Sequence, residues 1–210
     1  MLDGRDMRVD AVVVDKPFSD SCVQNRAPIF AVLQPRLSDC EHLLEIGSGT
    51  GQHAVYFAAE LPHLTWHTSD RAENHPGIMA WLTDSDLPNI QAPIALDVLQ
   101  DPWPERPFDA VFSANTAHIM SPTAVEAMFS GVGRVLRPGS HFLLYGPFNY
   151  DGRFTSPSNR DFDARLRAYD PAMGVRDVAW LTELATAVAM SLAEDIEMPM
   201  NNRLLIWQKS

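Results

Sequence analysis

The chain has 210 residues, of which 46% are hydrophobic, and its formal net charge is −11. This length and apolar content suit one globular domain with a sizeable core. The negative charge, without any block of basic residues, argues against a nucleic-acid partner, and the lack of an apolar run of about 18 residues argues against a membrane span.

The cysteines and the start of the sequence bear on cellular location. Cys22 and Cys40 are too few for a disulfide framework, and their spacing matches no zinc-binding pattern. The first ten residues, MLDGRDMRVD, are charged and have no apolar signal-peptide core. We therefore expect an N-terminal extension over 1–18, one domain over 19–210, a cytoplasmic location and no metal. A homodimer stays open as its assembly.

Segments typical of helices and strands alternate along the chain. A first helix is expected over 20–37, with an interruption near Pro28. The helix that starts at Ser121 and Pro122 has a capping residue followed by proline, and Pro138 and Gly139 should end it. The other predicted helices are 52–61 and 73–82, and the predicted strands are 42–46, 64–69, 90–96, 108–115 and 141–146. This alternation predicts an α/β fold, a parallel sheet with helices on both faces.

The last third of the chain follows a different pattern. Strands are predicted at 192–198 and 203–208, and the short link between them requires an antiparallel hairpin. Residues 147–175 are rich in Pro, Gly, Ser, Asn and Asp, with FDARLRAY as a short helix inside. Because long insertions in compact domains are usually functional, we expect this one to cover a substrate.

The stretch EIGSGTG, Glu45–Gly51, follows the first predicted strand. Its three glycines allow a sharp turn and close approach of a ligand to the backbone, with the amides of the next helix facing that ligand. A nucleotide-triphosphate loop would continue with Lys and Ser or Thr, but Gln52 and His53 follow here. The dinucleotide fingerprint would need glycine at position 52. The form acid-x-G-x-G-x-G instead matches the first motif of class I S-adenosylmethionine-dependent methyltransferases.

Polar residues stand at the ends of the next three predicted strands. Asp70 ends the second strand, where an acid can accept hydrogen bonds from ribose hydroxyls. Asp97 follows the third strand and could accept from an adenine amino group, with Val98 beside it as an apolar wall. Asn115 ends the fourth strand, where the methionine part of such a ligand would lie.

The chain resembles a class I methyltransferase from about residue 20 to its end. SDSCVQNRAPIF, EIGSGTGQHAVYFA, LPHLTWHTSD, SANTAHI, LLYGPFNYDGRFTSPSN and EMPMNNRLL resemble a methyltransferase-like family that includes bacterial members and animal methyltransferase-like protein 26. The resemblance implies a Rossmann-like, seven-stranded, mostly parallel sheet with an antiparallel C-terminal hairpin. It also implies S-adenosyl-L-methionine as cofactor and S-adenosyl-L-homocysteine as product, and little about the substrate.

The resemblance also implies which residues hold the cofactor. Arg26, in a helix that could fold over the cofactor, could bind its carboxylate bidentately. The chain departs from the family at Gly47, where members often have alanine, and we expect this difference to leave cofactor binding intact. The expected cofactor-binding residues are Arg26, Glu45, Gly47, Ser48, Gly49, Thr50, His53, Asp70, Asp97, Val98 and Asn115.

Methyl transfer is an in-line displacement, so the protein has to align the reactants and needs a base only if the acceptor must lose a proton. His118 is the candidate base, with a structural histidine as the alternative, and Tyr145 is the second catalytic candidate. Turn formation alone can account for the asparagines among the substrate candidates. Those candidates are Asn25, His118, Tyr145, Asn149, Tyr150, Ser156, Asn159, Asn201 and Asn202. Phe148, Phe154 and Phe162 either form a lid or pack in the core.

The sequence favours methyl transfer from S-adenosylmethionine to a small molecule. Aromatic and amide side chains with few basic groups favour a neutral or cationic, partly aromatic acceptor. Three alternatives stay open: a scaffold of the same fold that binds the cofactor without turnover, a nicotinamide-dependent oxidoreductase, and a nucleic-acid methyltransferase, which would need a basic face.

Overall fold

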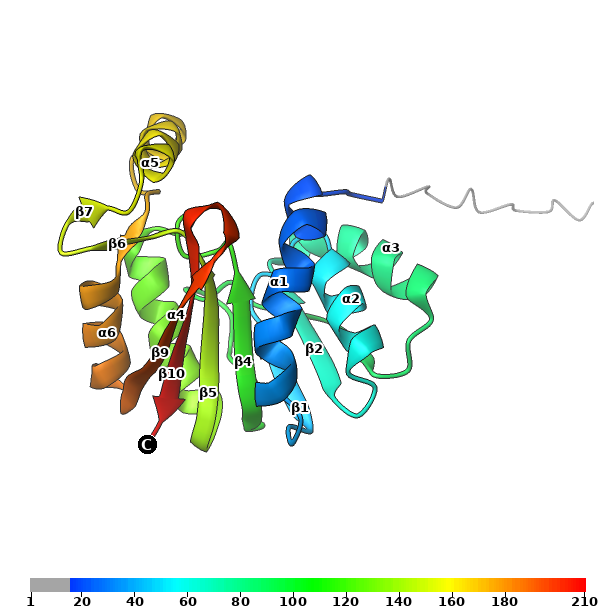
Figure 1. The fold of residues 1–210 in the computed structure, drawn as a ribbon. Helices are drawn as coiled ribbons and strands as arrows, with labels where there is room; N and C mark the ends of the chain where they lie inside the picture. The colour runs from blue at the N-terminus through cyan, green and yellow to red at the C-terminus, as the bar shows by residue number, and fades with distance from the viewer. Residues whose placement is uncertain (1–15) are drawn as a thin grey trace, which may run out of the picture.

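The structure is a computed structural model that describes residues 16–210 (Figure 1). The predicted N-terminal extension, 1–18, thus lies outside the described residues except for its last part. Within the described part of the chain, no helix is long and apolar enough to cross a membrane.

A seven-stranded sheet forms the centre of the molecule, in the order β3-β2-β1-β4-β5-β10-β9. Its strands are β1 (His42–Glu45), β2 (Thr65–Asp70), β3 (Ile90–Ala95), β4 (Phe108–Ala114), β5 (Leu136–Gly146), β9 (Met190–Met198) and β10 (Asn202–Lys209). The pairs from β3 to β5 are parallel, whereas β10 runs antiparallel to both β5 and β9. The predicted class I methyltransferase architecture with its antiparallel C-terminal hairpin is confirmed.

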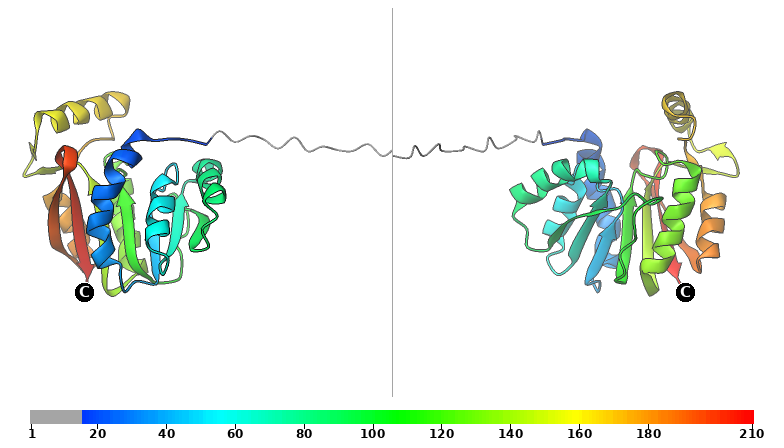
Figure 2. Two further views of the ribbon diagram at one scale, coloured as in Figure 1. Left: turned by 45° about the vertical axis from the view of Figure 1, so that its right-hand side comes forward. Right: turned by 180° about the vertical axis from the view of Figure 1, so that it is seen from behind.

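Helices cover both faces of this sheet (Figures 1 and 2). They are α1 (Asp20–Arg36), α2 (Gln52–Glu60), α3 (His75–Ser85), α4 (Pro122–Val135), α5 (Pro157–Tyr169) and α6 (Val178–Ala187), with short 3-10 turns η1 (Ala72–Asn74) and η2 (Pro199–Asn201). Buried residues of α1 and α2 pack on one face, and those of α4 and α6 pack on the other. Helix α5 stands above the sheet, beside the β9–β10 turn.

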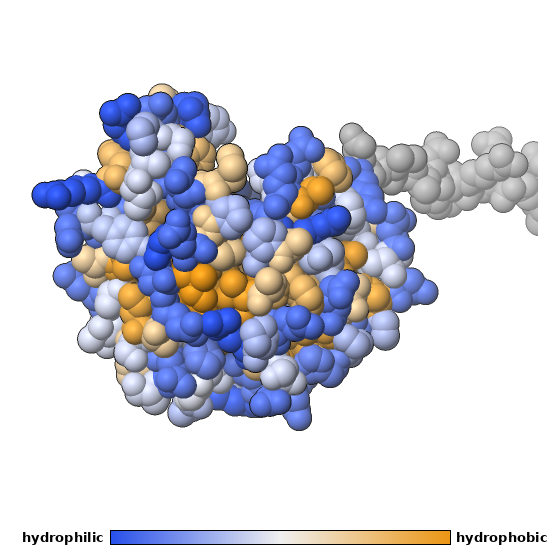
Figure 3. All heavy atoms as spheres, viewed as in Figure 1, coloured by the Kyte–Doolittle hydropathy of each residue, from blue (hydrophilic) through white to orange (hydrophobic). Residues whose placement is uncertain are grey.

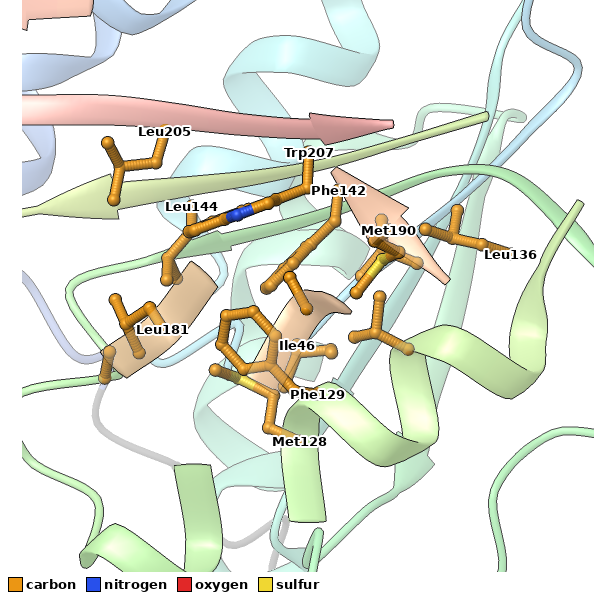
Figure 4. Packing of buried hydrophobic residues seen from close by; sticks show 14 of the residues in the cluster. Ile46, Met128, Phe129, Leu136, Phe142, Leu144, Leu181, Met190, Leu205 and Trp207 are labelled. Carbon is orange, nitrogen blue, oxygen red and sulfur yellow. The ribbon is translucent and has the colours of Figure 1, made fainter. Parts of the chain in front are cut away.

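Side-chain alternation along β5 supplies both core layers. Phe142 and Leu144 point to the α4 and α6 side, whereas Leu143 and Tyr145 point to the α1 and α2 side. Figure 4 shows the first layer, where Phe142 stacks on Trp207 with ring centroids 5.7 Å apart and Phe129 meets both rings edge-on. Burial of each such side chain contributes about 1.5–3 kcal/mol, which makes the sheet a rigid base for the residues at its edge.

Helix α1, the end of α4 and the start of β5 differ from the sequence prediction. Helix α4 ends at Val135, before Pro138 and Gly139, which lie within β5. Helix α1 is continuous through Pro28 and Pro35, because Ile29 and Leu33, one turn apart, are fully buried and hold the helix in place despite the lost hydrogen bonds. Strand β5 begins at Leu136 rather than at residue 141, and the residues up to His141 form a bulge against β4, with Gly139 at φ +84°.

The insertion is more ordered than its composition indicated. It contains a second, three-stranded sheet in the order β7-β6-β8, made of β6 (Phe148–Tyr150), β7 (Arg153–Phe154) and β8 (Arg176–Asp177). These strands and α6 were not predicted from the sequence, and α5 begins at Pro157, five residues before the predicted FDARLRAY helix. Strands of two or three residues carry no detectable periodicity, so tertiary pairing alone defines them.

One prediction follows from the packing of α4. Replacing glycine by alanine in a helix normally stabilises it by about 1 kcal/mol, but a Cβ at Gly131 would overlap the indole ring of Trp103. We expect Gly131→Ala to lower the free energy of unfolding by about 1–3 kcal/mol, measured by urea denaturation. The exposed neighbour Ser130→Ala should change it by less than about 0.5 kcal/mol. Equal stabilities of the two variants would contradict the packing described here.

Candidate functional site

A cavity of about 1070 Å³ lies over the carboxyl ends of the central strands. It opens between α5 and the amino-terminal part of α1, where the surface in Figure 3 is notched. The strand order reverses between β1 and β4, and a crevice at such a reversal is the usual ligand site of open α/β sheets. The cavity is lined from α1, the loop after β1, the ends of β2 to β5, α5 and the β9–β10 turn.

The glycine loop adopts backbone angles that favour glycine. Gly47 has φ +71° and Gly51 has φ +87°, a region in which residues with a Cβ are strained. A Cβ at Gly47 would also lie 2.6 Å from Cγ2 of Thr116. The alanine that the resembled family often carries here would therefore clash with Thr116. In this chain, the threonine at position 116 requires the glycine at position 47.

Glu45 supports the loop from behind rather than from within the cavity. Its side chain is 2% exposed, and its Oε2 accepts hydrogen bonds from Ser48 Oγ (2.8 Å) and Trp66 Nε1 (3.0 Å). Burial raises the pKa of this carboxyl to about 7. Glu45 does not line the cavity, so the structure places it one layer below the position expected from the motif.

Two strand-end acids line the cavity as predicted from their positions. Asp70 is buried, and its carboxylate accepts from the N–H groups of Gly49 and Arg71 and from Asn74, each at 2.8 Å. A carboxylate has about four lone-pair sites, so Asp70 keeps one for a ligand. Asp97 accepts from the N–H of Leu99 at 2.9 Å. Neither forms a salt bridge within residues 16–210.

Asn115 follows β4 in a left-handed conformation, φ +59°. Its N–H donates to the carbonyl of Tyr145 at 2.9 Å, which joins the ends of β4 and β5. Asparagine tolerates this conformation better than other residues with a Cβ, and such strained positions cluster at functional sites. Asn115 and the predicted adenine wall Val98 both line the cavity.

The α1 helix meets the loop through His53 at the start of α2. His53 Nε2 lies 2.7 Å from Asn25 Oδ1, and its Nδ1 lies 3.9 Å from Cys22 Sγ. Burial lowers the pKa of His53 to about 4, with the nearby Arg26 as a further cause, so the imidazole is neutral at pH 7. Cys22, Asn25 and His53 line the cavity, whereas Arg26 does not. The Arg26 guanidinium instead lies over the Tyr56 ring, 4.6 Å from its centroid, outside the cavity lining.

His118 faces the cavity in the loop after β4. The residue is 6% exposed, its ring meets that of Phe162 edge-on at 5.1 Å, and its ring nitrogens hydrogen-bond to no other part of the described chain. Burial lowers the pKa of this imidazole to about 4, and the positive charge of Arg176 adds to the effect. A neutral imidazole without a protein partner can accept a proton from a bound molecule.

Three predicted substrate residues line the same cavity as His118 and contact one another or the β9–β10 turn. The Tyr145 hydroxyl oxygen accepts from Asn202 Nδ2 at 2.9 Å, and burial raises the pKa of this phenol. Asn159 of α5 donates to Asn201 O at 3.0 Å and so ties the insertion to the β9–β10 turn. Tyr145, Asn159 and Asn202 all line the cavity, as Asn25 does.

Four predicted substrate residues lie outside the cavity lining and have structural partners. Ser156 caps α5 by accepting from the N–H of Asn159, and Asn201 donates to Ser158 Oγ. Tyr150 donates to Asp195 Oδ2 at 2.6 Å, and Asn149 is buried beside Val175. Turn and cap chemistry thus explains Ser156 and Asn201.

The three insertion phenylalanines have three different environments. Phe162 lines the cavity, Phe148 is fully buried in the core, and Phe154 is exposed away from the cavity. The other cavity residues were not singled out from the sequence, although many of them lie within the quoted motif stretches. These are Ser19, Ser21, Cys22, Gln24, Pro28, Ile46, Arg71, Asn74, Leu96, Leu99, Ala114, Thr116, Ile119, Met120, Ser121, Ala124, Pro147, Ser158, Arg165, Asp170, Met173, Pro199 and Met200.

The lining residues fit the adenosyl cofactor that the motif implies. A Cβ at Gly49 would meet no atom within 4 Å, so the loop backbone faces open space where a ligand can approach. Two carboxylates without cationic partners lie at the ends of β2 and β3, suited to hydroxyl and amino donors. Among residues 16–210, no cluster of three or more His, Cys, Asp or Glu side chains could hold a metal ion.

A family model described as "Protein of unknown function (DUF938)" matches residues 16–209. The chain belongs to the DUF938 family. The resemblance to the methyltransferase-like protein 26 family found in its sequence is confirmed at this level. The family description assigns no activity, so the function has to be inferred from the site.

Solved structures with the same fold include proteins described as O-methyltransferases. An O-methyltransferase family protein from Burkholderia thailandensis matches with a TM-score of 0.78 and 15% identity over 91% of this chain and 58% of its own. The mitomycin 7-O-methyltransferase matches with a TM-score of 0.77 and 14% identity, over 90% of this chain and 54% of its own. An O-methyltransferase from neocarzinostatin biosynthesis matches with a TM-score of 0.75 and 14% identity, over 90% of this chain and 55% of its own. That enzyme was solved with S-adenosylmethionine and 2-hydroxy-5-methyl naphthoic acid. This chain spans little more than half the length of these proteins, and identities this low show the fold alone.

The buried carboxyl of Glu45 generates a prediction about stability and pH. Its folded pKa, about 7, is raised above the ordinary 4.5, so its stabilising contribution is complete below pH 4.5 and is lost as pH rises through 7. Glu45→Gln cannot ionise and keeps an oxygen acceptor for Ser48 and Trp66. We expect the variant to gain about 1–3 kcal/mol relative to wild type between pH 5 and pH 8 in urea titrations. A stability difference that does not change with pH would contradict a raised pKa.

Proposed function

We propose that the protein transfers a methyl group from S-adenosylmethionine to a hydroxyl of a small, partly aromatic molecule. The observation that carries this proposal is the neutral, unpartnered imidazole of His118, which faces the same cavity as the glycine loop and the two strand-end carboxylates. When bound, S-adenosylmethionine supplies a methyl carbon on a sulfonium, open to in-line attack by the acceptor.

The cofactor half of the cavity lies beside the glycine loop. Asp70 would accept from the ribose hydroxyls and Asp97 from the adenine amino group, with Val98 and Leu96 as apolar walls. The backbone of Asn115 and the loop would contact the methionine part. Arg26 has no role in this arrangement, because its guanidinium lies on Tyr56.

The acceptor half lies beneath α5. His118 would take the proton of the acceptor hydroxyl as the oxygen attacks. Tyr145 accepts a hydrogen bond from Asn202, so its own O–H is free to donate to the acceptor and orient it. Phe162, Met173 and Met200 give this half apolar surface. Arg165 and Asp170 offer charges of both signs at its rim, which suits a neutral acceptor.

The solved structures support oxygen as the accepting atom. Those of the mitomycin and neocarzinostatin pathways are both O-methyltransferases. The neocarzinostatin enzyme was solved with a hydroxylated naphthoic acid, which is small and aromatic. A neutral base beside the cavity is what a hydroxyl acceptor needs, since a hydroxyl has to lose its proton during transfer.

Cofactor binding is the first test of the proposal. Wild type should bind S-adenosylhomocysteine in isothermal titration, whereas Asp70→Asn and Asp97→Asn should each weaken binding by about 1–3 kcal/mol, or roughly 5–150-fold. Glu60→Gln, an exposed acid at the end of α2, serves as the control for the loss of one charge. Wild-type affinity in both aspartate variants would refute the assignment of the cofactor half.

Methyl transfer is the second test, with radiolabelled S-adenosylmethionine and a panel of phenols, catechols and hydroxylated aromatic acids. His118→Asn should lower turnover roughly 10²–10⁴-fold and leave S-adenosylhomocysteine affinity unchanged. Because the pKa of His118 is about 4, wild-type turnover should stay constant from pH 8 towards pH 5 and fall as the imidazole becomes protonated. Tight binding without transfer to any acceptor would favour the scaffold alternative.

A further inference from the structure

Arg176 of β8 lies next to His118 and was not singled out by any sequence pattern. The residue is 7% exposed, although arginine is rarely buried without a partner. No carboxylate of residues 16–210 forms a salt bridge with it. A buried cation without a paired anion costs stability, so its presence beside the candidate base calls for a physical explanation.

The guanidinium is held by backbone carbonyls on both sides of His118. Nε donates to Ala117 O at 3.1 Å, and Nη2 donates to Met120 O and, at 2.7 Å, to Ala172 O. One planar group therefore joins the loop that carries His118 to the end of the insertion. Because the guanidinium is rigid and its donors have fixed directions, this contact sets the orientation of the loop.

Neighbouring contacts hold the insertion against the same loop. The N–H of Gly174 donates to His118 O at 2.9 Å, and the N–H of Val175 donates to Asp163 Oδ1 at 2.8 Å. Asp163 is in turn paired with Arg167 at 2.8 Å. The backbone of His118 is thus fixed by residues 172–176, while its ring nitrogens stay free for a ligand.

Charged groups of both signs lie on the elements around His118. Asp163 is paired with Arg167, and Arg176 is the charged group that lowers the pKa of the imidazole. The titratable and charged groups on these elements are Arg137, His141 and Tyr145 of β5, Arg160, Asp161, Asp163, Arg165, Arg167 and Tyr169 of α5, Asp170 after α5, and Arg176 and Asp177 of β8. A fixed positive charge disfavours a second one on the imidazole.

We propose that Arg176 is the positioning residue of His118: its guanidinium orients the loop that carries the imidazole and holds a fixed positive charge beside that ring. This inference rests on the proposed function in one respect: His118 acts as a base only if a bound acceptor supplies a proton.

The test compares Arg176→Gln, which removes the charge, with Arg176→Lys, which keeps the charge and loses the planar donors. Arg160→Gln is the matched control, since it removes an exposed arginine of α5 that pairs only with Asp161. The imidazole of His118 is titrated by NMR in the full-length protein, with its signal assigned by its loss in His118→Asn. This measurement needs neither cofactor nor acceptor.

In Arg176→Gln the titration midpoint of His118 should lie roughly 0.5 pH unit or more above wild type, whereas Arg176→Lys and Arg160→Gln should stay near wild type. Arg176→Lys should show faster hydrogen exchange over residues 115–121 and slower methyl transfer at unchanged S-adenosylhomocysteine affinity. A midpoint in Arg176→Gln equal to that of Arg160→Gln overturns the electrostatic role.

If Arg176→Gln does not fold, Arg176→Lys still tests the positioning role. Hydrogen exchange and turnover in Arg176→Lys that equal those of wild type overturn that role. If wild type transfers no methyl group while the His118 midpoint still moves in Arg176→Gln, the proposed function fails and the control of His118 by Arg176 stands. If wild type transfers a methyl group but the His118 midpoint does not move in Arg176→Gln, the proposed function stands and the control of His118 by Arg176 fails.

Discussion

The hydrogen-bonded junction between the glycine loop and the end of β2 is the constraint on which the candidate site depends. The N–H groups of Gly47 and Ser48 both donate to Ser69 O at 3.0 Å, and that of Gly49 donates to Asp70 Oδ2 at 2.8 Å. Three consecutive amides are thus held by the neighbouring strand. A shift of the loop would break all three hydrogen bonds, and the amide of Ser48, the buried residue of the three, would be left unpaired at a cost of about 1–3 kcal/mol.

Two separate polar networks hold the two halves of the cavity. On the cofactor side, the buried carboxyl of Glu45 binds Ser48 and Trp66 beneath the loop. On the acceptor side, Arg176 binds the carbonyls around His118. Each network buries an ionisable group in a place where an apolar residue would cost less. The molecule therefore gives up some stability for fixed geometry, as is usual at functional sites.

The fold by itself does not decide between an enzyme and a binding protein. Its sheet order is shared with O-methyltransferases at about 15% identity, and one fold supports many functions. The candidate site adds the chemical state of a few groups: carboxylates without cationic partners at two strand ends, and an imidazole that is buried, neutral and free of hydrogen bonds to residues 16–210. These properties depend on the environment of each side chain and not on the strand order.

The sequence by itself determined the strand and helix alternation, the C-terminal hairpin and the positions of Asp70, Asp97 and Asn115 at one edge of the sheet. These are local patterns: apolar periodicity specifies each element, and parallel strands bring their carboxyl ends to the same edge. The turn at the loop glycines was predicted for a similar reason, because the lack of a Cβ at each glycine itself permits the positive φ found there.

Only the tertiary structure decided which of the polar residues face the cavity. Glu45 and Arg26 sit in motif positions yet point to Trp66 and Tyr56, while Arg176 has no motif and lies against the loop of His118. The direction of a side chain is set by partners distant in sequence, here 21, 30 and 59 positions away, and no local pattern records them. The same holds for the neutral state of His118, which follows from burial and from a cation that folding brings beside it.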